Sequence, residues 1–170
     1  MNTERILEKL GISELNAMQQ EAGEAILRQR RDVLVLSPTG TGKTLAYLLP
    51  IVQLLQPENS DVQALVVVPG RELALQSDMV LKSMGTGLRS AACYGGRTAM
   101  DEHRKLKEVR PQIIFGTPGR LNDHLGKQNI SPYGVRFVVI DEFDKCLSMG
   151  FYDEMEHRSE EHTSELQSRL

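Results

Sequence analysis

Residues 37–44 read Ser-Pro-Thr-Gly-Thr-Gly-Lys-Thr, a composition and spacing that could bind phosphate. Glycines let the backbone curl so that several N–H groups point at one anion, and the start of a following helix adds the positive end of its dipole. The apolar run 33–36 precedes the loop, and apolar residues at helical spacing follow it, which favours a strand, a turn and a helix. The predicted phosphate-binding residues are Thr39, Gly40, Thr41, Gly42, Lys43 and Thr44.

Two side chains of this loop could add chemistry to the backbone contacts. Lys43 would reach the β- and γ-phosphates of a nucleotide, and the hydroxyl of Thr44 would hold Mg²⁺. Ser37 stands where the strict pattern has glycine. The alternative is therefore a glycine-rich turn with a solvated lysine.

Two carboxylates, Asp141 and Glu142, follow the apolar run 138–140. A nucleotide hydrolase places such a pair beside its phosphate loop. Asp141 would hold Mg²⁺ through water, and Glu142 would orient and deprotonate the attacking water. The predicted catalytic residues are therefore Lys43, Asp141 and Glu142, and the predicted metal ligands are Thr44 and Asp141. The alternative is an exposed acidic turn after a strand.

The elements that must position these groups alternate along the chain. We expect strands at 33–36, 64–68, 90–93, 112–115 and 136–140. We expect helices at 18–28, 44–55, 71–84, 100–109 and 120–126. Near-continuous apolar strands between helices are typical of a doubly wound α/β domain with a mostly parallel sheet and helices on both faces.

Composition bounds the class of protein. The chain of 170 residues is long enough for one domain, and its net charge of −3 argues against nucleic-acid binding through bulk charge alone. Cys93 and Cys146 are far apart and form no Cys-x-x-Cys pattern, which favours reduced thiols and a cytoplasmic location. We expect no secretory signal and no membrane contact, because no apolar run is long enough to cross a bilayer.

The run Asp-Glu-Phe-Asp at 141–144 resembles the Asp-Glu-Ala-Asp signature of the DEAD-box RNA helicases. Further matches follow the order of that family. They are Gln19, which resembles its glutamine motif, Pro-Gly-Arg-Glu-Leu at 69–73, the glycine pair Gly95 and Gly96, and Thr-Pro-Gly-Arg at 117–120. The resemblance covers residues 5–157 and is far more specific than the phosphate loop alone.

This resemblance implies a RecA-like P-loop domain with ATP and Mg²⁺ as cofactors and RNA as a partner; protein partners stay unspecified. Residues 1–157 would be the first RecA-like domain, incomplete at the C-terminus, with the glutamine-motif region at about 1–31. Gln19 would bind the adenine edge. RNA would be bound through its backbone, independently of sequence, by Arg71, Gly95, Gly96, Thr117, Gly119 and Arg120. The implied activity is RNA-stimulated ATP hydrolysis coupled to RNA unwinding.

Two other functions stay open at this point. One is an ATP-binding RNA clamp or chaperone with negligible turnover, and the other is a DNA helicase or a generic P-loop ATPase. The charge-rich stretch 97–110 is interpreted as a solvated helix face, and His103, His124 and His157 as surface residues without metal-ligand spacing.

Residues 158–170 change in character and resemble the translation of a sequencing adapter. We expect them to be a non-native tail that packs on nothing. In RecA-like sheets the strands beside the phosphate-loop strand come later in the chain, so residues 33–36 would lack both neighbours here. We therefore expect the chain to be inactive alone and not to form a stable, ATP-competent monomer.

Overall fold

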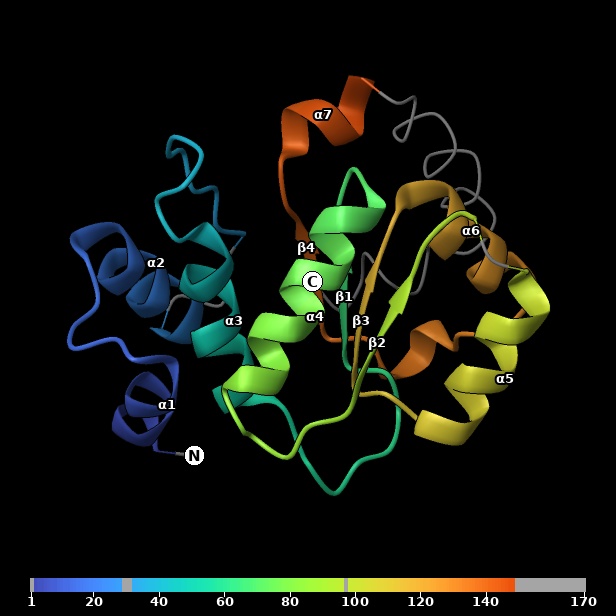
Figure 1. Cartoon of the computed structure of the whole chain (residues 1–170), viewed down its shortest axis with the longest axis horizontal. Helices are drawn as coiled ribbons and strands as arrows, with labels where there is room; N and C mark the ends of the chain where they lie inside the picture. Colours follow the sequence, from blue (N-terminus) through green and yellow to red (C-terminus); the bar gives the residue numbers. More distant parts are fainter. Residues whose placement is uncertain (1, 29–31, 97, 149–170) are drawn as a thin grey trace.

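The computed structural model describes residues 2–28, 32–96 and 98–148 (Figure 1). Its centre is a parallel four-stranded sheet in the order β2-β3-β1-β4. The strands are β1 (Ala64–Val67), β2 (Ser90–Cys93), β3 (Ile113–Gly116) and β4 (Phe137–Ile140). The predicted α/β class with a parallel sheet is confirmed. The expected tail, 158–170, lies outside the described residues.

The five predicted helices are all present, with ends moved by one or two residues. They are α2 (Ala17–Arg28), α3 (Lys43–Leu54), α4 (Arg71–Ser83), α5 (Ala99–Val109) and α6 (Pro118–Gly126). Three further elements were not predicted: α1 (Thr3–Leu10), the 3₁₀ turn η1 (Pro132–Gly134) and α7 (Phe143–Ser148). Asn2 caps α1 by accepting backbone hydrogen bonds, and Gly11 ends that helix at φ 68°. None of the helices described combines the length and apolar character needed to cross a bilayer.

Side chains of each strand alternate between two apolar layers. On β1, Ala64 and Val66 belong to the larger cluster, which α3 and α4 cover. Leu65 and Val67 belong to the smaller cluster, which includes Leu106 of α5 and residues of α6 and α7. Figure 1 shows α3 and α4 on one side of the sheet and α5 and α6 on the other. Helices on both faces explain why β1, β2 and β3 are buried throughout.

Residues 33–36 are not a strand, so this prediction was wrong. In the sheet, β1 pairs with β3 and β4, and no strand in the described part of the chain pairs with residues 33–36. The side chains of Leu34 and Leu36 are 74% and 85% exposed. Without a neighbouring strand, backbone N–H and C=O groups must be solvated, which keeps the segment at the surface. The expectation that this run would lack sheet pairing is confirmed.

The loops that follow the four strands lie at one edge of the sheet, because all the strand pairs are parallel. In spatial order, Gly95 and Gly96 follow β2, residues 117–120 follow β3, residues 69–71 follow β1, and Asp141 follows β4. Ligands of open α/β sheets bind at the carboxyl ends of strands. The fold therefore gathers the predicted motifs at the edge where ligands are expected.

Candidate functional site

The phosphate loop leads directly into α3, whose first residue is Lys43. Gly40 and Gly42 have φ of 83° and 81°, a backbone conformation that favours glycine. A Cβ on Gly42 would also lie 2.5 Å from Nε2 of Gln19. Thr39 and Gly40 lie exposed at the turn. Glycine at 42 is thus favoured by the backbone conformation of the turn, and a larger residue would also displace the amide of Gln19.

The Lys43 ammonium is bound to its own loop. Its Nζ donates hydrogen bonds to the carbonyl oxygens of Ser37, at 2.7 Å, and Pro38, at 2.9 Å. The hydroxyls of Ser37 and Thr41 lie 2.6 Å apart, and Thr41 also donates to Pro38. An incoming phosphate would exchange these carbonyl contacts for contacts to charged oxygens, which are stronger partners for an ammonium.

Gln19, on α2, joins the glutamine motif to the phosphate loop. Its Nε2 donates to the carbonyl of Gly42 at 3.2 Å, and its Oε1 accepts from the backbone N–H of Asn16 at 3.0 Å. The amide of Asn16 donates to the carbonyl of Thr41 at 3.1 Å. Both ends of the Gln19 amide are therefore engaged in this conformation, and any contact with a base would have to compete with or supplement these bonds.

Asp141 lies at the end of β4 and is held by two donors. The phenol of Tyr47 on α3 donates to Oδ2 at 3.2 Å, and the backbone N–H of Glu142 donates to Oδ1 at 2.9 Å. Burial raises the pKa of Asp141, while both hydrogen bonds and Lys43 act in the opposite direction. Sequence reasoning missed Tyr47. Its place on α3, four residues after Lys43 and on the same helical face, is the signal that could have found it.

The donor groups near Asp141 fit Mg²⁺. The hydroxyl of Tyr47 donates to the carboxylate of Asp141, and a hydrogen bond to the side chain of Thr44 acts to lower the pKa of Tyr47, so Thr44 and Asp141 both neighbour this phenol. Hydroxyl and carboxylate oxygens are hard ligands of the kind that Mg²⁺ prefers. Binding of Mg²⁺ by Thr44 and Asp141 stays a prediction.

Glu142 has a left-handed backbone, with φ of 50°, at the point where the chain turns from β4 into α7. Such a conformation is uncommon for a residue other than glycine and clusters at functional sites. Its carboxylate accepts a hydrogen bond from Nζ of Lys145 at 2.8 Å. This hydrogen bond is the main reason that the pKa of the exposed Lys145 ammonium is raised. In this conformation the proposed base is paired with a neighbouring cation.

The residues predicted to contact RNA lie on three adjacent loops. Arg71 is exposed at the start of α4, and its guanidinium lies 5.1 Å from the centre of the Tyr94 ring. Gly95 and Gly96 are exposed after β2, and Gly96 has φ of 93°. The next loop along this edge holds Thr117, and its Gly119 is exposed in the first turn of α6.

The interpretation of 97–110 as a wholly solvated face was wrong for Glu102, and the interpretation of His124 as a surface residue was also wrong. Glu102 and His124 are 4% and 0% exposed in their side chains, and Nε2 of His124 lies 2.8 Å from Oε2 of Glu102. Glu102 precedes Leu106 by one turn, so both lie on the face of α5 that packs on β2. That spacing was the available signal, and the surrounding charges concealed it.

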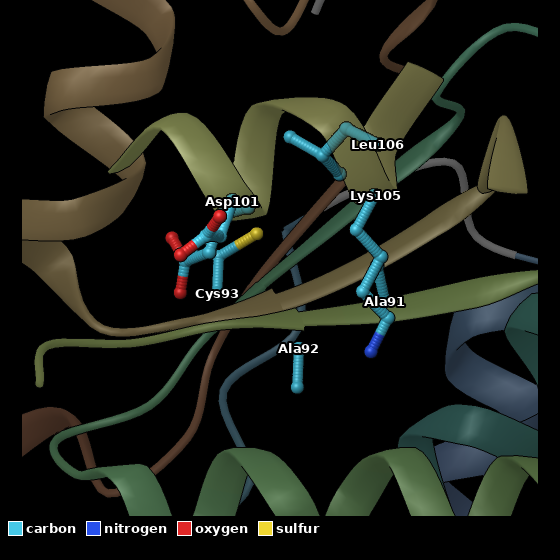
Figure 2. A pocket seen from close by; sticks show the side chains of 7 residues that line it. Ala91, Ala92, Cys93, Asp101, Lys105 and Leu106 are labelled. Carbon is cyan, nitrogen blue, oxygen red and sulfur yellow. The ribbon is translucent and has the colours of Figure 1, made fainter. Parts of the chain in front are cut away.

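Cys93, Glu102 and His124 bring atoms of the metal-ligating type within 4.8 Å of one another. A cavity of about 40 Å³ is lined by Cys93 and Glu102, and Figure 2 shows Cys93 of β2 and Asp101, Lys105 and Leu106 of α5 along its wall. The carboxylate of Glu102 is already bound, however, because it also pairs with Arg120, whose Nε lies 3.4 Å from Oε2. An arginine on the same oxygen opposes a cation there. The cluster is better described as a buried ion pair.

Comparison with known proteins places these motifs in one family. Residues 16–168 match the model of the DEAD/DEAH box helicase family. DEAD-box ATP-dependent RNA helicase CshA of Bacillus subtilis is 38% identical over 154 residues, which are 89% of this chain and 31% of that protein. RhpA of Helicobacter pylori is 40% identical over 148 residues, 86% of this chain and 30% of that protein. The chain thus spans about a third of the length of these relatives.

Solved structures agree with the sequence relatives. The structure of DEAD-box helicase Mss116 bound to ssRNA and UDP-BeF aligns with a TM-score of 0.84 and 33% identity. It covers 92% of this chain and 34% of that one. The yeast DEAD-box splicing factor Prp28 aligns with a TM-score of 0.80 and 27% identity, over 89% of this chain and 37% of that one. Motifs, fold and relatives agree, and the chain belongs to the DEAD/DEAH box helicase family.

Proposed function

We propose that this chain is the ATP-binding and RNA-binding part of an ATP-dependent RNA helicase, which couples RNA-stimulated ATP hydrolysis to the unwinding of RNA duplexes. The observation that carries the proposal is the order of the loops along the carboxyl edge of the sheet. The carboxylates Asp141 and Glu142 follow β4, and the loops expected to contact RNA follow β1, β3 and β2. Nucleotide chemistry and RNA contacts thus occupy neighbouring parts of one edge.

The nucleotide would lie on the phosphate loop. Backbone N–H groups of the loop would surround its phosphates, and Lys43 would leave Ser37 and Pro38 to bind phosphate oxygens. Thr44 and Asp141 would hold Mg²⁺, which, when bound, neutralises charge on the phosphate oxygens. Gln19 would select adenine from its position beside Gly42, where base contacts and loop geometry are coupled through one amide.

Hydrolysis would use Glu142 as the base. Its carboxylate would accept a proton from water as the oxygen of that water attacks the γ-phosphorus and the bond to the bridging oxygen breaks. In the present conformation Lys145 occupies this carboxylate, so the base would have to exchange that partner for water. Lys43 would stabilise the charge that develops on the transferred group.

RNA would be bound through its sugar–phosphate backbone. The expected contacts come from Arg71, from the N–H groups of Gly95 and Gly96, and from residues 117–120 at the start of α6. Backbone contacts carry little base information, so binding would be independent of sequence. The relative Mss116 was solved with ssRNA bound, which supports RNA as the partner.

The proposed working compartment is the cytoplasm. Cys93 and Cys146 are both free and buried. Free thiols without a disulfide are typical of proteins that work in a reducing compartment. This proposal is independent of the enzymatic one.

The experiment that tests the activity is a steady-state phosphate-release assay with and without single-stranded RNA. Because the chain spans about a third of its relatives, we would assay it alone and as a fusion to the part of Bacillus subtilis CshA that follows the matched region. The proposal expects RNA-stimulated hydrolysis and duplex unwinding by the fusion. Tight binding of ATP and RNA with negligible turnover would favour a clamp, and equal stimulation by single-stranded DNA would favour a different helicase or a generic ATPase.

A further inference from the structure

We infer that Glu102 is a positioning residue that fixes the two RNA-facing loops, the one with Gly95 and Gly96 and the one at 117–120, relative to each other. The inference rests on the proposed function, because it concerns the surface expected to meet RNA. Glu102 itself lies beneath that surface with 4% of its side chain exposed. It would therefore act through the residues that it binds.

The carboxylate of Glu102, from α5, uses both of its oxygens on two other segments. Oε1 accepts the backbone N–H of Tyr94 at 2.9 Å, directly before the glycine pair. Oε2 pairs with two residues of α6: Nε2 of His124 lies 2.8 Å away and Nε of Arg120 lies 3.4 Å away. One buried side chain thus joins the segment after β2 to the helix after β3.

A backbone hydrogen bond also joins the same two segments. The N–H of Thr117 donates to the carbonyl of Cys93 at 3.1 Å, which continues the pairing of β2 with β3 by one residue. Beyond this bond the two loops leave the sheet. Tyr94 follows Cys93 in sequence, and Arg120 follows Thr117. Glu102 binds both Tyr94 and Arg120, so its contacts hold them in place where strand pairing has ended.

Because Glu102 is buried, its partners must stay in fixed positions around the carboxylate. A buried carboxylate is costly unless charged or hydrogen-bonding partners surround it, and loss of one partner leaves an unsatisfied group. Nδ2 of Asn129 lies 3.0 Å from Nδ1 of His124. With that amide donating to Nδ1, Nε2 carries the proton and donates to Glu102. The imidazole is therefore held in one orientation, which makes the support of the carboxylate rigid.

Arg71, which follows β1 and is expected to contact RNA, joins this network through an aromatic ring. The guanidinium of Arg71 lies 5.1 Å from the centre of the Tyr94 ring, and the N–H of Tyr94 is the group that Glu102 binds. Displacement of Tyr94 would therefore move the surface on which Arg71 rests. The network connects the loops after β1, β2 and β3 to one carboxylate.

A substitution that removes the charge of Glu102 separates a positioning role from an electrostatic one, because the two roles predict opposite changes in RNA affinity. Glu102→Gln removes a negative charge near an expected phosphate-binding surface, so electrostatics alone would strengthen RNA binding or leave it unchanged. Positioning predicts the opposite. We expect the affinity of the fusion protein for fluorescein-labelled oligouridine to fall about five- to tenfold, as when a hydrogen bond to a buried charged group is lost. The slope of log affinity against log salt should stay the same, because no phosphate contact is removed.

Glu108→Gln is the matched control, since Glu108 is an exposed carboxylate on the same helix. It should leave RNA affinity unchanged or raise it slightly. Hydrogen exchange measured by mass spectrometry gives a readout that does not need RNA. In Glu102→Gln, exchange should accelerate in the peptides that contain Gly95, Gly96 and 117–120, and not in β1 or α3. The Glu108→Gln chain should match the wild type.

The inference is overturned if Glu102→Gln binds RNA as tightly as the wild type, or if its exchange in the two loops is unchanged. Should this variant fail to fold, Asn129→Ala replaces it. Loss of the Nδ2 contact leaves the imidazole of His124 free to turn away from Oε2 of Glu102, so positioning predicts weaker RNA binding, and wild-type affinity would contradict it. Failure of the wild-type fusion to bind any RNA would count against the proposed function, and loop exchange would still decide the role of Glu102.

Discussion

The phenol of Tyr47 on α3 donates a hydrogen bond to Oδ2 of Asp141 at the end of β4, a contact between residues 94 positions apart. The bond joins the helix that follows the phosphate loop to the turn after β4, where the two carboxylates lie. Burial is the main cause that raises the pKa of Tyr47, followed by the charge of Asp141, so the phenol stays a neutral donor. It fixes the orientation of a proposed Mg²⁺ ligand.

Tyr47→Phe should keep the fold and weaken the use of Mg²⁺. Phenylalanine fills the same space but leaves Oδ2 without this donor. We expect hydrolysis by the fusion to fall on the order of 10-fold at limiting Mg²⁺, the size found when an outer-shell partner of a metal ligand is lost. A titration of phosphate release against Mg²⁺ measures this. The control is Tyr133→Phe, whose hydroxyl lies on a residue that is 84% exposed. Identical titrations for Tyr47→Phe and wild type would refute the role.

Glu142→Gln should retain ATP binding and lose hydrolysis, because the amide cannot accept the proton from water. Lys43→Ala should lower the rate by about 10²–10³, as expected for a preorganised electrostatic group. RNA-stimulated phosphate release by the fusion is the measurement, with nucleotide affinity determined in parallel. Lys145→Ala is a useful companion, since it frees the carboxylate of Glu142 without removing it. Wild-type turnover by Glu142→Gln would exclude Glu142 as the base.

Gln19→Ala should narrow the preference for ATP over GTP. A site built around a hydrogen bond rejects ligands that leave the group unpaired, and removal of the amide removes that selection. The same substitution deletes the bond to the carbonyl of Gly42, so affinity for both nucleotides should fall together. Competition binding with the four nucleotides separates the two effects. If the wild type shows no preference among bases, the adenine role is wrong and the loop contact alone remains.

Arg71→Ala should weaken binding of single-stranded RNA by a similar factor for every sequence. It should also lower the salt slope by about one phosphate contact. Fluorescence anisotropy with oligouridine and oligoadenosine at several salt concentrations tests both statements. Arg104→Ala, on the outer side of α5, controls for the loss of a positive charge. A loss confined to one sequence would show base recognition instead.

The 170-residue chain alone should gain no thermal stability from Mg-ATP, although the predicted phosphate ligands are present. Residues 33–36 lead into the phosphate loop without pairing in the described sheet, so the loop has little support on that side. The entropy cost of ordering the loop would then offset the free energy of nucleotide binding. Differential scanning calorimetry with and without Mg-ATP tests this. A cooperative transition that moves upward with nucleotide would show that the loop is competent as it stands.

The strands of the sheet and the helices around it were predictable from local sequence. Continuous apolar runs such as 64–68 indicate strands buried on both faces, and β1 covers most of that run. Parallel pairing then places Asp141 and Thr117 at one edge, so part of the site followed from the fold class. The spatial order β2-β3-β1-β4 differs from the order along the chain, but parallel pairing still brings the loops with the carboxylates and the glycine pair to the same edge.

What could not be predicted depended on contacts between distant residues. The run 33–36 has the pattern of a strand, but a pattern does not say whether a partner strand is available. Glu102 lies one turn before Leu106 but in a stretch rich in exposed charges, which concealed that signal, and the packing of α5 on β2 shows that it points inward. Tyr47 and Asp141 meet because α3 covers the sheet beside β4, a relationship that no local window contains.

Alkylation of the two buried thiols, Cys93 and Cys146, would report local opening of the structure around each of them. Burial raises the pKa of Cys93 to about 12 and that of Cys146 to about 11, so neither is a reactive thiolate at neutral pH. Cys93 is the last residue of β2 and its carbonyl accepts the N–H of Thr117, while the Sγ of Cys146 donates to the carbonyl of Asp141 at 3.4 Å. Alkylation at each sulfur therefore requires a transient excursion of a different part of the molecule. The two alkylation rates, measured in one sample, would therefore report the rate of local opening near the RNA-facing loops and near the two carboxylates separately.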